Sequence, residues 1–214
     1  PSKVIVVETD EFHPSDRMVG FVFGFPGVYL TPDGPRLKQC SHMLGVHPEW
    51  QNREIGFRLK RAQWQMVRHQ DIDRITWTFD PLLSSNANLN IARLGAVCNT
   101  YLRDAYGEMR DGLNSGIPSD RFQVDWWVNT TRVHSRLGNK PRPRLTLAHF
   151  LTAETVIINP GRFDEDDFLW PSRSAEWRLD HVSANKQQII LVEIPANYQI
   201  MKSRRLQLAL EWRL

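Results

Sequence analysis

The sequence contains few cysteines and no long apolar run. Its two cysteines, Cys40 and Cys98, lack the spacing of a metal site, and one pair cannot specify a disulfide framework. No stretch approaches the ~20 apolar residues that a bilayer span needs, and no charged start followed by an apolar run marks a secretory signal. The sequence therefore predicts a soluble, cytoplasmic protein with no metal and no membrane partner.

Charge is also weakly biased, because the formal net charge is only +3. The one dense basic stretch, residues 132–144, has no interleaved aromatic side chains, whereas single-strand binders usually combine basic charge with stacking rings. We therefore expect no nucleic-acid partner, and only this stretch and the sequence pI of about 9.1 favour one. The stretch is otherwise a solvated linker, or a set of arginines able to neutralise a phosphate or carboxylate.

The composition is that of a globular chain, with 41% hydrophobic and 24% charged residues. Eight tryptophans, several beside apolar residues, indicate a packed core. A length of 214 residues suits one large domain, or one domain with a substantial extension.

Runs of β-branched and aromatic residues predict strands at residues 4–7, 18–25, 42–46, 75–79 and 121–128. Between the third and fourth of these, a helical period predicts an amphipathic helix over residues 54–70. Its apolar face would contain Ile55, Leu59, Ala62 and Met66, with the polar residues on its other faces: Arg58, Lys60, Arg61 and Gln65. A second helix is predicted at residues 85–94, with Gly95 as its C-terminal cap.

A strand, a helix and a strand in this order predict a parallel pair joined by a right-handed crossover helix. Residues 129–144 are rich in Asn, Thr, Arg and Pro, which favours a linker or long surface loop. We expect a core at residues 1–130, followed by a linker and an α+β extension over 131–214. In that extension, residues 155–158 and 189–194 are strand-like, residues 164–167 form an acidic turn, and the pattern through residues 200–210 is helical.

The most informative stretch is residues 42–56, where a strand ends in a polar turn and a helix begins. Such a junction presents unpaired backbone N–H groups and a positive helix end, which together suit a phosphate. The run Gln51-Asn52-Arg53-Glu54-Ile55-Gly56 resembles the acyl-CoA loop of the GNAT superfamily of N-acyltransferases. That loop has Gln or Arg, two variable residues, Gly, a variable residue, then Gly or Ala. The preceding run Met43-Leu44-Gly45-Val46 is similar to the strand that splays from its neighbour and binds the pantetheine arm.

The resemblance extends to residues 86–96, which are similar to the second GNAT signature, and to the strand order as far as Val128. It implies an α+β, three-layer fold: a mixed, twisted central sheet flanked by helices, with residues 41–46 diverging from the strand around Thr76. It also implies acetyl-CoA or another acyl-CoA as cosubstrate. The sequences of several segments resemble those of a poorly characterised group of GNAT proteins that have a long C-terminal extension. That likeness implies an acetyl or succinyl donor and a small-molecule amine acceptor, such as an amino acid, and leaves a homodimer open.

Mapping the resemblance onto this chain gives one set of cofactor-binding residues: Leu44, Gly45, Val46, Gln51, Asn52, Arg53, Glu54, Ile55, Gly56, Asn86 and Asn88. For Asn86 and Asn88 the alternative is capping of the helix, because Asn is a common cap residue. The two readings are equally supported by the sequence.

For catalysis, the resemblance implies that His42 is a general base, since an imidazole titrates near neutral pH. We expect His42 on the same strand face as Leu44 and Val46, and a packed histidine is the alternative. Tyr106, or else Tyr101, could protonate the departing thiolate, although either is more often a packing residue. Glu108 is a weaker candidate for a base acting through water, since a solvated carboxylate in a turn is commoner.

Three departures from the family pattern set the alternatives. Glu54 stands where the loop motif has its first Gly, so a module with impaired CoA binding competes with an active acyltransferase. Ile91 occupies the place of the family's aromatic general acid. The chain also begins directly at a strand, whereas the family has a strand and two helices first, so we expect it to be a fragment of a longer protein.

Overall fold

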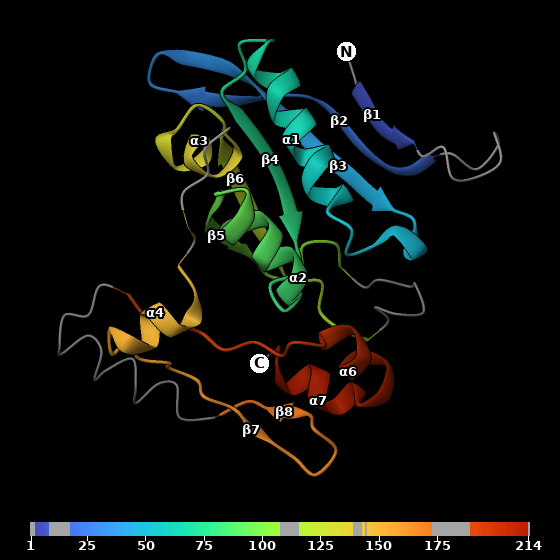
Figure 1. Cartoon of the computed structure of the whole chain (residues 1–214), viewed down its shortest axis with the longest axis vertical. Coiled ribbons are helices and arrows are strands. Elements are labelled where there is room, and N and C mark those ends of the chain that lie inside the picture. Colours follow the sequence, from blue (N-terminus) through green and yellow to red (C-terminus); the bar gives the residue numbers. More distant parts are fainter. Residues whose placement is uncertain are drawn as a thin grey trace. The chain divides into compact units, whose positions relative to one another are not determined.

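The computed structural model describes residues 3–8, 18–107, 116–138, 143, 145–172 and 189–213. Its residues fall into two units, which are described separately (Figure 1). The first, here called the sheet unit, comprises Pro1–Phe79, Asn88–Leu102 and Arg121–Arg142. The second unit comprises Asp80–Ala87, Arg103–Asp120 and Pro143–Leu214.

The sheet unit contains a mixed sheet of six strands in the order β1-β2-β3-β4-β6-β5. The strands are β1 (Lys3–Glu8), β2 (Met18–Thr31), β3 (Gly34–Val46), β4 (Arg74–Phe79), β5 (Val97–Leu102) and β6 (Arg121–Trp127). Only β3 and β4 pair in parallel, and α1 (Ile55–Arg68) connects them as the predicted crossover helix. The predicted fold class, a mixed sheet flanked by helices, is confirmed.

The strand predictions hold at their positions, with two differences. β2 and β3 extend well beyond the predicted segments to a two-residue turn, where Gly34 adopts a φ of +111°. A positive φ of this kind is easiest for glycine, so Gly34 suits the end of this hairpin. β5 was not anticipated, because it follows Gly95 without an intervening polar segment.

The apolar core of the sheet unit joins α1 to β2. Val19 and Val22 of β2 pack with Ile55 and Leu59 of α1, and all four are buried. The predicted apolar face of α1 is rotated from the observed one, which comprises Ile55, Leu59, Lys60, Gln63, Trp64 and Val67. Lys60 was therefore wrongly placed on an outer face. Lys60 and Gln63 are buried within the apolar face of α1 because their side chains form hydrogen bonds with each other and with Ser41.

The second predicted helix is present with a different winding. A short turn α2 (Ser84–Ala87) leads into a π-helical segment η2 (Asn88–Arg93), in which Leu94 N donates to Leu89 O, 2.9 Å away. Gly95 ends the segment with a φ of +74°, which confirms its predicted role as a cap.

The predicted loop over residues 129–144 is wrong for its first half, which forms helix α3 (Thr131–Leu137). The Thr130 side chain accepts a hydrogen bond from Val133 N and caps the helix start. Val133 and Leu137 are buried on one side of this helix. A cap and two apolar residues four positions apart suffice for a short packed helix, despite the polar composition.

The second unit contains short elements: α4 (Leu147–Thr152), β7 (Arg162–Phe163), β8 (Leu169–Trp170), α6 (Tyr198–Arg204) and α7 (Leu206–Glu211). Its apolar cluster comprises Leu82, Tyr198, Met201, Leu208 and Ala209. The predicted C-terminal helical pattern is confirmed as two helices, and the acidic turn lies between β7 and β8.

The strands predicted at residues 155–158 and 189–194 are wrong, because only an isolated bridge, Ile157 to Leu191, forms between them. Side chains replace the rest of the ladder. The Asn159 amide donates to Glu193 O and accepts from Glu193 N, at 2.9 and 2.7 Å. Asn side chains compete with strand pairing in this way.

Cys40 and Cys98 are free thiols. Among the helices of the described residues, none is long and apolar enough to cross a membrane. The same residues contain no group of three or more His, Cys, Asp or Glu side chains suited to a metal ion.

Candidate active site

The central feature of the sheet unit is a wedge between two of its strands. β3 and β4 pair only at Gln39 with Ile75 and at Cys40 with Thr76. β3 then continues to Val46 and β4 continues to Phe79, and the two strands do not pair with each other beyond these positions. We call residues 41–46 of β3 and 77–79 of β4 the wedge. The predicted divergence of these two strands is confirmed.

The wedge leaves one edge of β3 available to a ligand. On its other side β3 stays paired with β2 as far as Val46. Because successive backbone groups of a strand alternate between its two neighbours, the β4-facing N–H and C=O groups of residues 41–46 have no ladder partner. An extended ligand with amide groups can pair with such an edge as an added strand does.

The start of α1 lies directly beyond the wedge along the chain. After β3 comes a short turn, η1 (Pro48–Trp50), and then Glu54 as the N-cap of α1. The first intrahelical bond runs from Arg58 N to Glu54 O at 2.9 Å, so the three preceding N–H groups, of residues 55–57, have no acceptor within the helix. No side chain caps this end. Free N–H groups and the helix dipole together favour an anion here.

Glu54 adopts a backbone conformation that glycine adopts more easily than other residues. Its φ is +65°, in the left-handed region, and Asn52 in the same loop has a φ of +62°. The Glu54 side chain is 61% exposed and forms an ion pair with Arg93 of η2. The Arg93 guanidinium also stacks over the Phe57 ring at 4.3 Å. The carboxylate is therefore held by a cation rather than left free over the helix start.

A β-bulge displaces His42 from its expected position. Met43 pairs with Phe23 and Ser41 pairs with Gly24, which leaves His42 between them without a partner on β2. A bulge adds one residue to a strand, so the alternation of its side chains is interrupted at that point.

The prediction that His42 shares a face with Leu44 and Val46 is therefore wrong. Val46 packs against the α1 core, and Leu44 lies near Gly56 of α1. The His42 ring instead lies against Phe25, with 5.7 Å between ring centroids, and against Phe23 at 6.3 Å. His42 is exposed, so its imidazole is accessible from the face of the sheet opposite α1.

Lys60 of α1 lies at the closed end of the wedge, a feature that the sequence reasoning missed. Its Nζ donates to Ser41 Oγ at 2.7 Å and to Gln63 Oε1 at 3.1 Å, and lies 3.7 Å from the centroid of the Trp77 ring. The residue is only 3% exposed, and burial lowers the pKa of its amine to about 7. Its position next to Leu59 and three residues before Gln63, on the buried face of α1, was the sequence feature that could have predicted its burial.

No protein-family model and no curated protein matches the chain. Solved structures do match. NAA60 of Arabidopsis thaliana, in complex with a bisubstrate analogue, is 13% identical over 60% of this chain and 77% of its own, with a TM-score of 0.49. Naa20 of Chaetomium thermophilum, also with a bisubstrate analogue, is 15% identical over 64% and 70%, with a TM-score of 0.46. A Desulfovibrio desulfuricans protein assigned to the GNAT acetyltransferases is 16% identical over 59% and 69%, with a TM-score of 0.43.

At these identities and TM-scores the matches say nothing about the function of this chain. A single parallel pair splays within an otherwise antiparallel sheet, and its crossover helix begins at the open end of the splay. The splayed parallel pair and its crossover helix are those that the resemblance to the GNAT superfamily implied.

The sheet unit brings most of the predicted cofactor-binding residues together around the wedge and the start of α1. Leu44, Gly45 and Val46 lie on β3, residues 51–54 lie in the loop, and Ile55 and Gly56 open α1. The loop side chains are exposed, and Arg53 stacks on Trp50 at 4.8 Å. Asn88 is exposed at the start of η2 in the same unit.

The remaining predicted site residues are placed differently. Asn86 and Tyr106 belong to the second unit, and Tyr106 is 60% exposed. Tyr101 lies on β5 of the sheet unit, where its ring packs edge-on against Phe122 at 5.4 Å. Glu108 lies outside the described residues.

Two arginines of the basic stretch hold α3 in place. Arg132 Nε donates to Gly95 O at 2.9 Å, and Arg136 Nε donates to Ala92 O at 3.0 Å. These bonds satisfy carbonyls at the end of η2, where helical segments leave acceptors unpaired. Arg132 and Arg136 were predicted to lie in a solvated linker or to bind an anion. Their side chains instead donate hydrogen bonds to backbone carbonyls.

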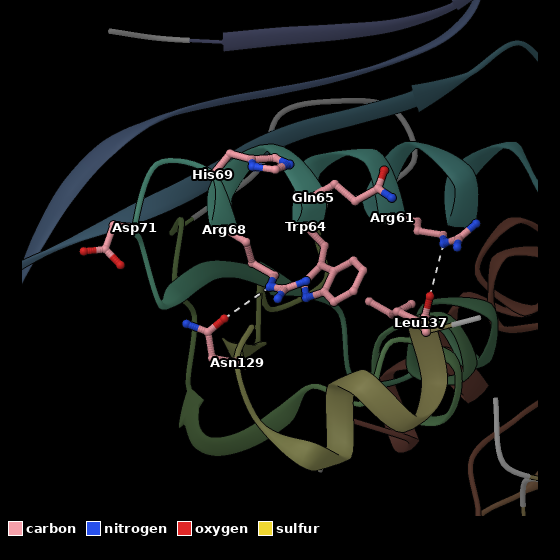
Figure 2. A pocket seen from close by; sticks show the side chains of 9 residues that line it. Arg61, Trp64, Gln65, Arg68, His69, Asp71, Asn129 and Leu137 are labelled. Atoms are coloured by element: carbon pink, nitrogen blue, oxygen red, sulfur yellow. Dashed lines mark hydrogen bonds between the residues drawn. The ribbon is translucent and has the colours of Figure 1, made fainter. Parts of the chain in front are cut away.

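A hollow of about 540 Å³ lies elsewhere in the sheet unit, between the outer side of α1 and residues around α3 (Figure 2). Its lining includes Arg61, which donates to Leu137 O at 3.1 Å, and Arg68, which donates to Asn129 Oδ1 at 3.3 Å. None of the predicted site residues lines it. The wedge is therefore the better candidate for the active site.

Proposed function

We propose that this protein is an N-acyltransferase that moves an acetyl or succinyl group from CoA to the amine of a small molecule, such as an amino acid. The observation that carries the proposal is the wedge between β3 and β4, which opens toward the uncapped start of α1. The β3 edge offers backbone groups to the amides of a pantetheine arm, and the N–H groups of residues 55–57 suit a pyrophosphate.

The thioester of the donor supplies an activated acyl group, and the chain's residues hold and orient it. A pantetheine arm paired with β3 between Val46 and Ser41 directs the thioester toward the closed end of the wedge. Preorganised backbone N–H groups at that point would stabilise negative charge that develops on the carbonyl oxygen.

His42 is the proposed general base. Its exposed ring lies on the face of the sheet opposite α1, next to Phe23 and Phe25. An amine that approaches from this face would reach the closed end of the wedge from the side opposite the helix. His42 then accepts the ammonium proton, and the two phenylalanine rings provide an apolar wall for the acceptor.

The second candidate is a GNAT-like module with impaired CoA binding. Glu54 is the observation that favours it, because a carboxylate stands at the helix start where the phosphates would lie. The ion pair with Arg93 weakens this objection, since the pair presents less negative charge than a free carboxylate.

Thermal unfolding of the whole chain with acetyl-CoA and succinyl-CoA separates the two. A ligand at 100 times its Kd should add about 2.7 kcal/mol to the free energy of unfolding. Stabilisation by either donor, followed by release of free CoA thiol when amines are added, supports the acyltransferase. The amines should include amino acids and a short peptide with a free N-terminus, because turnover of the peptide alone would overturn the small-molecule acceptor. No stabilisation by either donor favours the binding-impaired module.

A further inference from the structure

A buried amine at the closed end of the wedge has no role in the proposed reaction. The two wedge strands last pair at Cys40 and Thr76, and the next residues are Ser41 and Trp77. Lys60 Nζ touches both of these residues, 2.7 Å from Ser41 Oγ and 3.7 Å from the Trp77 ring centroid. The amine therefore lies where the strands begin to part.

This position coincides with the place where the thioester would lie. In the proposed binding mode the phosphates are at the start of α1 and the pantetheine arm runs back along β3 toward Ser41. The acyl group then reaches the end of the wedge, next to Lys60. No other lysine of the described residues has both this burial and this position: Lys38 is only partly buried, and Lys202 is buried in the second unit.

The surroundings of Lys60 favour a neutral, nucleophilic amine. Ser41 Oγ and Gln63 Oε1 accept two N–H bonds from Nζ, which is the number that a neutral amine can donate. Burial lowers the pKa of this amine to about 7, so much of it is neutral near pH 7. Lysines in such surroundings can act as nucleophiles.

We propose that Lys60 is a self-acylation site, at which its amine takes the acyl group from an acyl-CoA bound in the wedge. This inference rests on the proposed function. The Nζ lone pair attacks the thioester carbonyl carbon, an N–C bond forms and the C–S bond breaks. The amine gives up one proton and the departing CoA thiolate takes up one, so the products are an amide at Lys60 and free CoA thiol.

The test is peptide mass analysis of the whole chain after incubation with acetyl-CoA. Lys60 should gain one acetyl group while Lys38 and Lys202 stay at the level of a sample without acetyl-CoA. An excess of free CoA should suppress the modification of Lys60. From pH 6 to pH 8 the rate should rise about tenfold and then level off, whereas an ordinary surface lysine should accelerate about a hundredfold.

Binding of CoA, measured by calorimetry on the same sample, keeps this inference separate from the proposed function. If CoA binds and Lys60 remains unmodified at pH 8, the self-acylation site is wrong and the proposed function is not contradicted. If CoA does not bind and Lys60 is unmodified, both are wrong. Equal modification of all three lysines, or modification of Lys60 that free CoA does not suppress, also overturns the site. Lys60→Met should not be modified at this position. The proposal is tested by the modification of Lys60 in the parent chain.

Discussion

The Glu54 carboxylate forms an ion pair with the Arg93 guanidinium across the start of α1, and Glu54 holds a left-handed backbone conformation while doing so. A residue with a side chain pays about 1–2 kcal/mol for that conformation, which glycine adopts freely. An exposed ion pair contributes about 0–1 kcal/mol in return. This geometry therefore predicts that replacing Glu54 with glycine does not lower the free energy of unfolding.

We predict that Glu54→Gly tightens acetyl-CoA binding at least tenfold and leaves the free energy of unfolding equal or slightly higher. The variant removes a negative charge and a side chain from the phosphate position and relieves the backbone. Calorimetry and urea unfolding at one ionic strength provide the measurements. Glu54→Gln is the matched control, because it removes only the charge. Equal affinity in all three proteins would mean that the phosphates do not lie at this helix start.

His42→Ala should lower turnover of the best amine by roughly 10²–10⁴-fold and change the Kd for CoA little, because a general base need not touch the donor. His47→Ala is the control, since His47 is also exposed and follows the same strand. Steady-state kinetics measures turnover, and calorimetry measures the Kd for CoA, on each variant. Unchanged turnover in His42→Ala would leave His42 as a packing partner of Phe23 and Phe25.

Lys60→Met should stabilise the protein at neutral pH and flatten its pH dependence above neutrality. The folded pKa of Lys60 is lowered from 10.5 to about 7, so the unfolded chain binds more protons between these values. The contribution of Lys60 to the stability of the parent chain should therefore rise with pH from about 7 to 10.5, by at most about 5 kcal/mol. Urea unfolding across that range checks this. Lys38→Met should retain the parent's slope, and an identical slope in Lys60→Met would contradict the prediction.

Cys98 should react slowly with iodoacetamide in the folded chain. Burial, and then the nearby Asp125 carboxylate, raise the pKa of its thiol to about 11. At pH 8 the folded protein should be alkylated at Cys98 more than about a hundredfold more slowly than the urea-unfolded chain, because the thiolate is the reactive form. Peptide mapping over time in a Cys40→Ser variant isolates this thiol. Similar rates in the folded and unfolded chains would contradict the prediction.

The sequence alone determined the elements whose signal is local. Runs of β-branched and aromatic residues located the strands around Val22, Ile75 and Val124, and the helical period located α1. The order strand, helix, strand predicted a parallel crossover, and the resemblance of residues 43–46 to a splaying strand predicted the divergence beyond Cys40. These features depend on neighbours in the chain, so they are readable from one sequence.

The tertiary structure alone decided which way side chains point at the site. A bulge opposite Phe23 and Gly24 turned His42 away from α1, and no local pattern marks a bulge. Lys60 entered the core because Ser41 and Gln63 satisfy its amine, and Ser41 is 19 residues away in the chain. Residues distant in sequence supply these hydrogen bonds and pairing registers, and a propensity or a period cannot encode partners that only folding brings within reach.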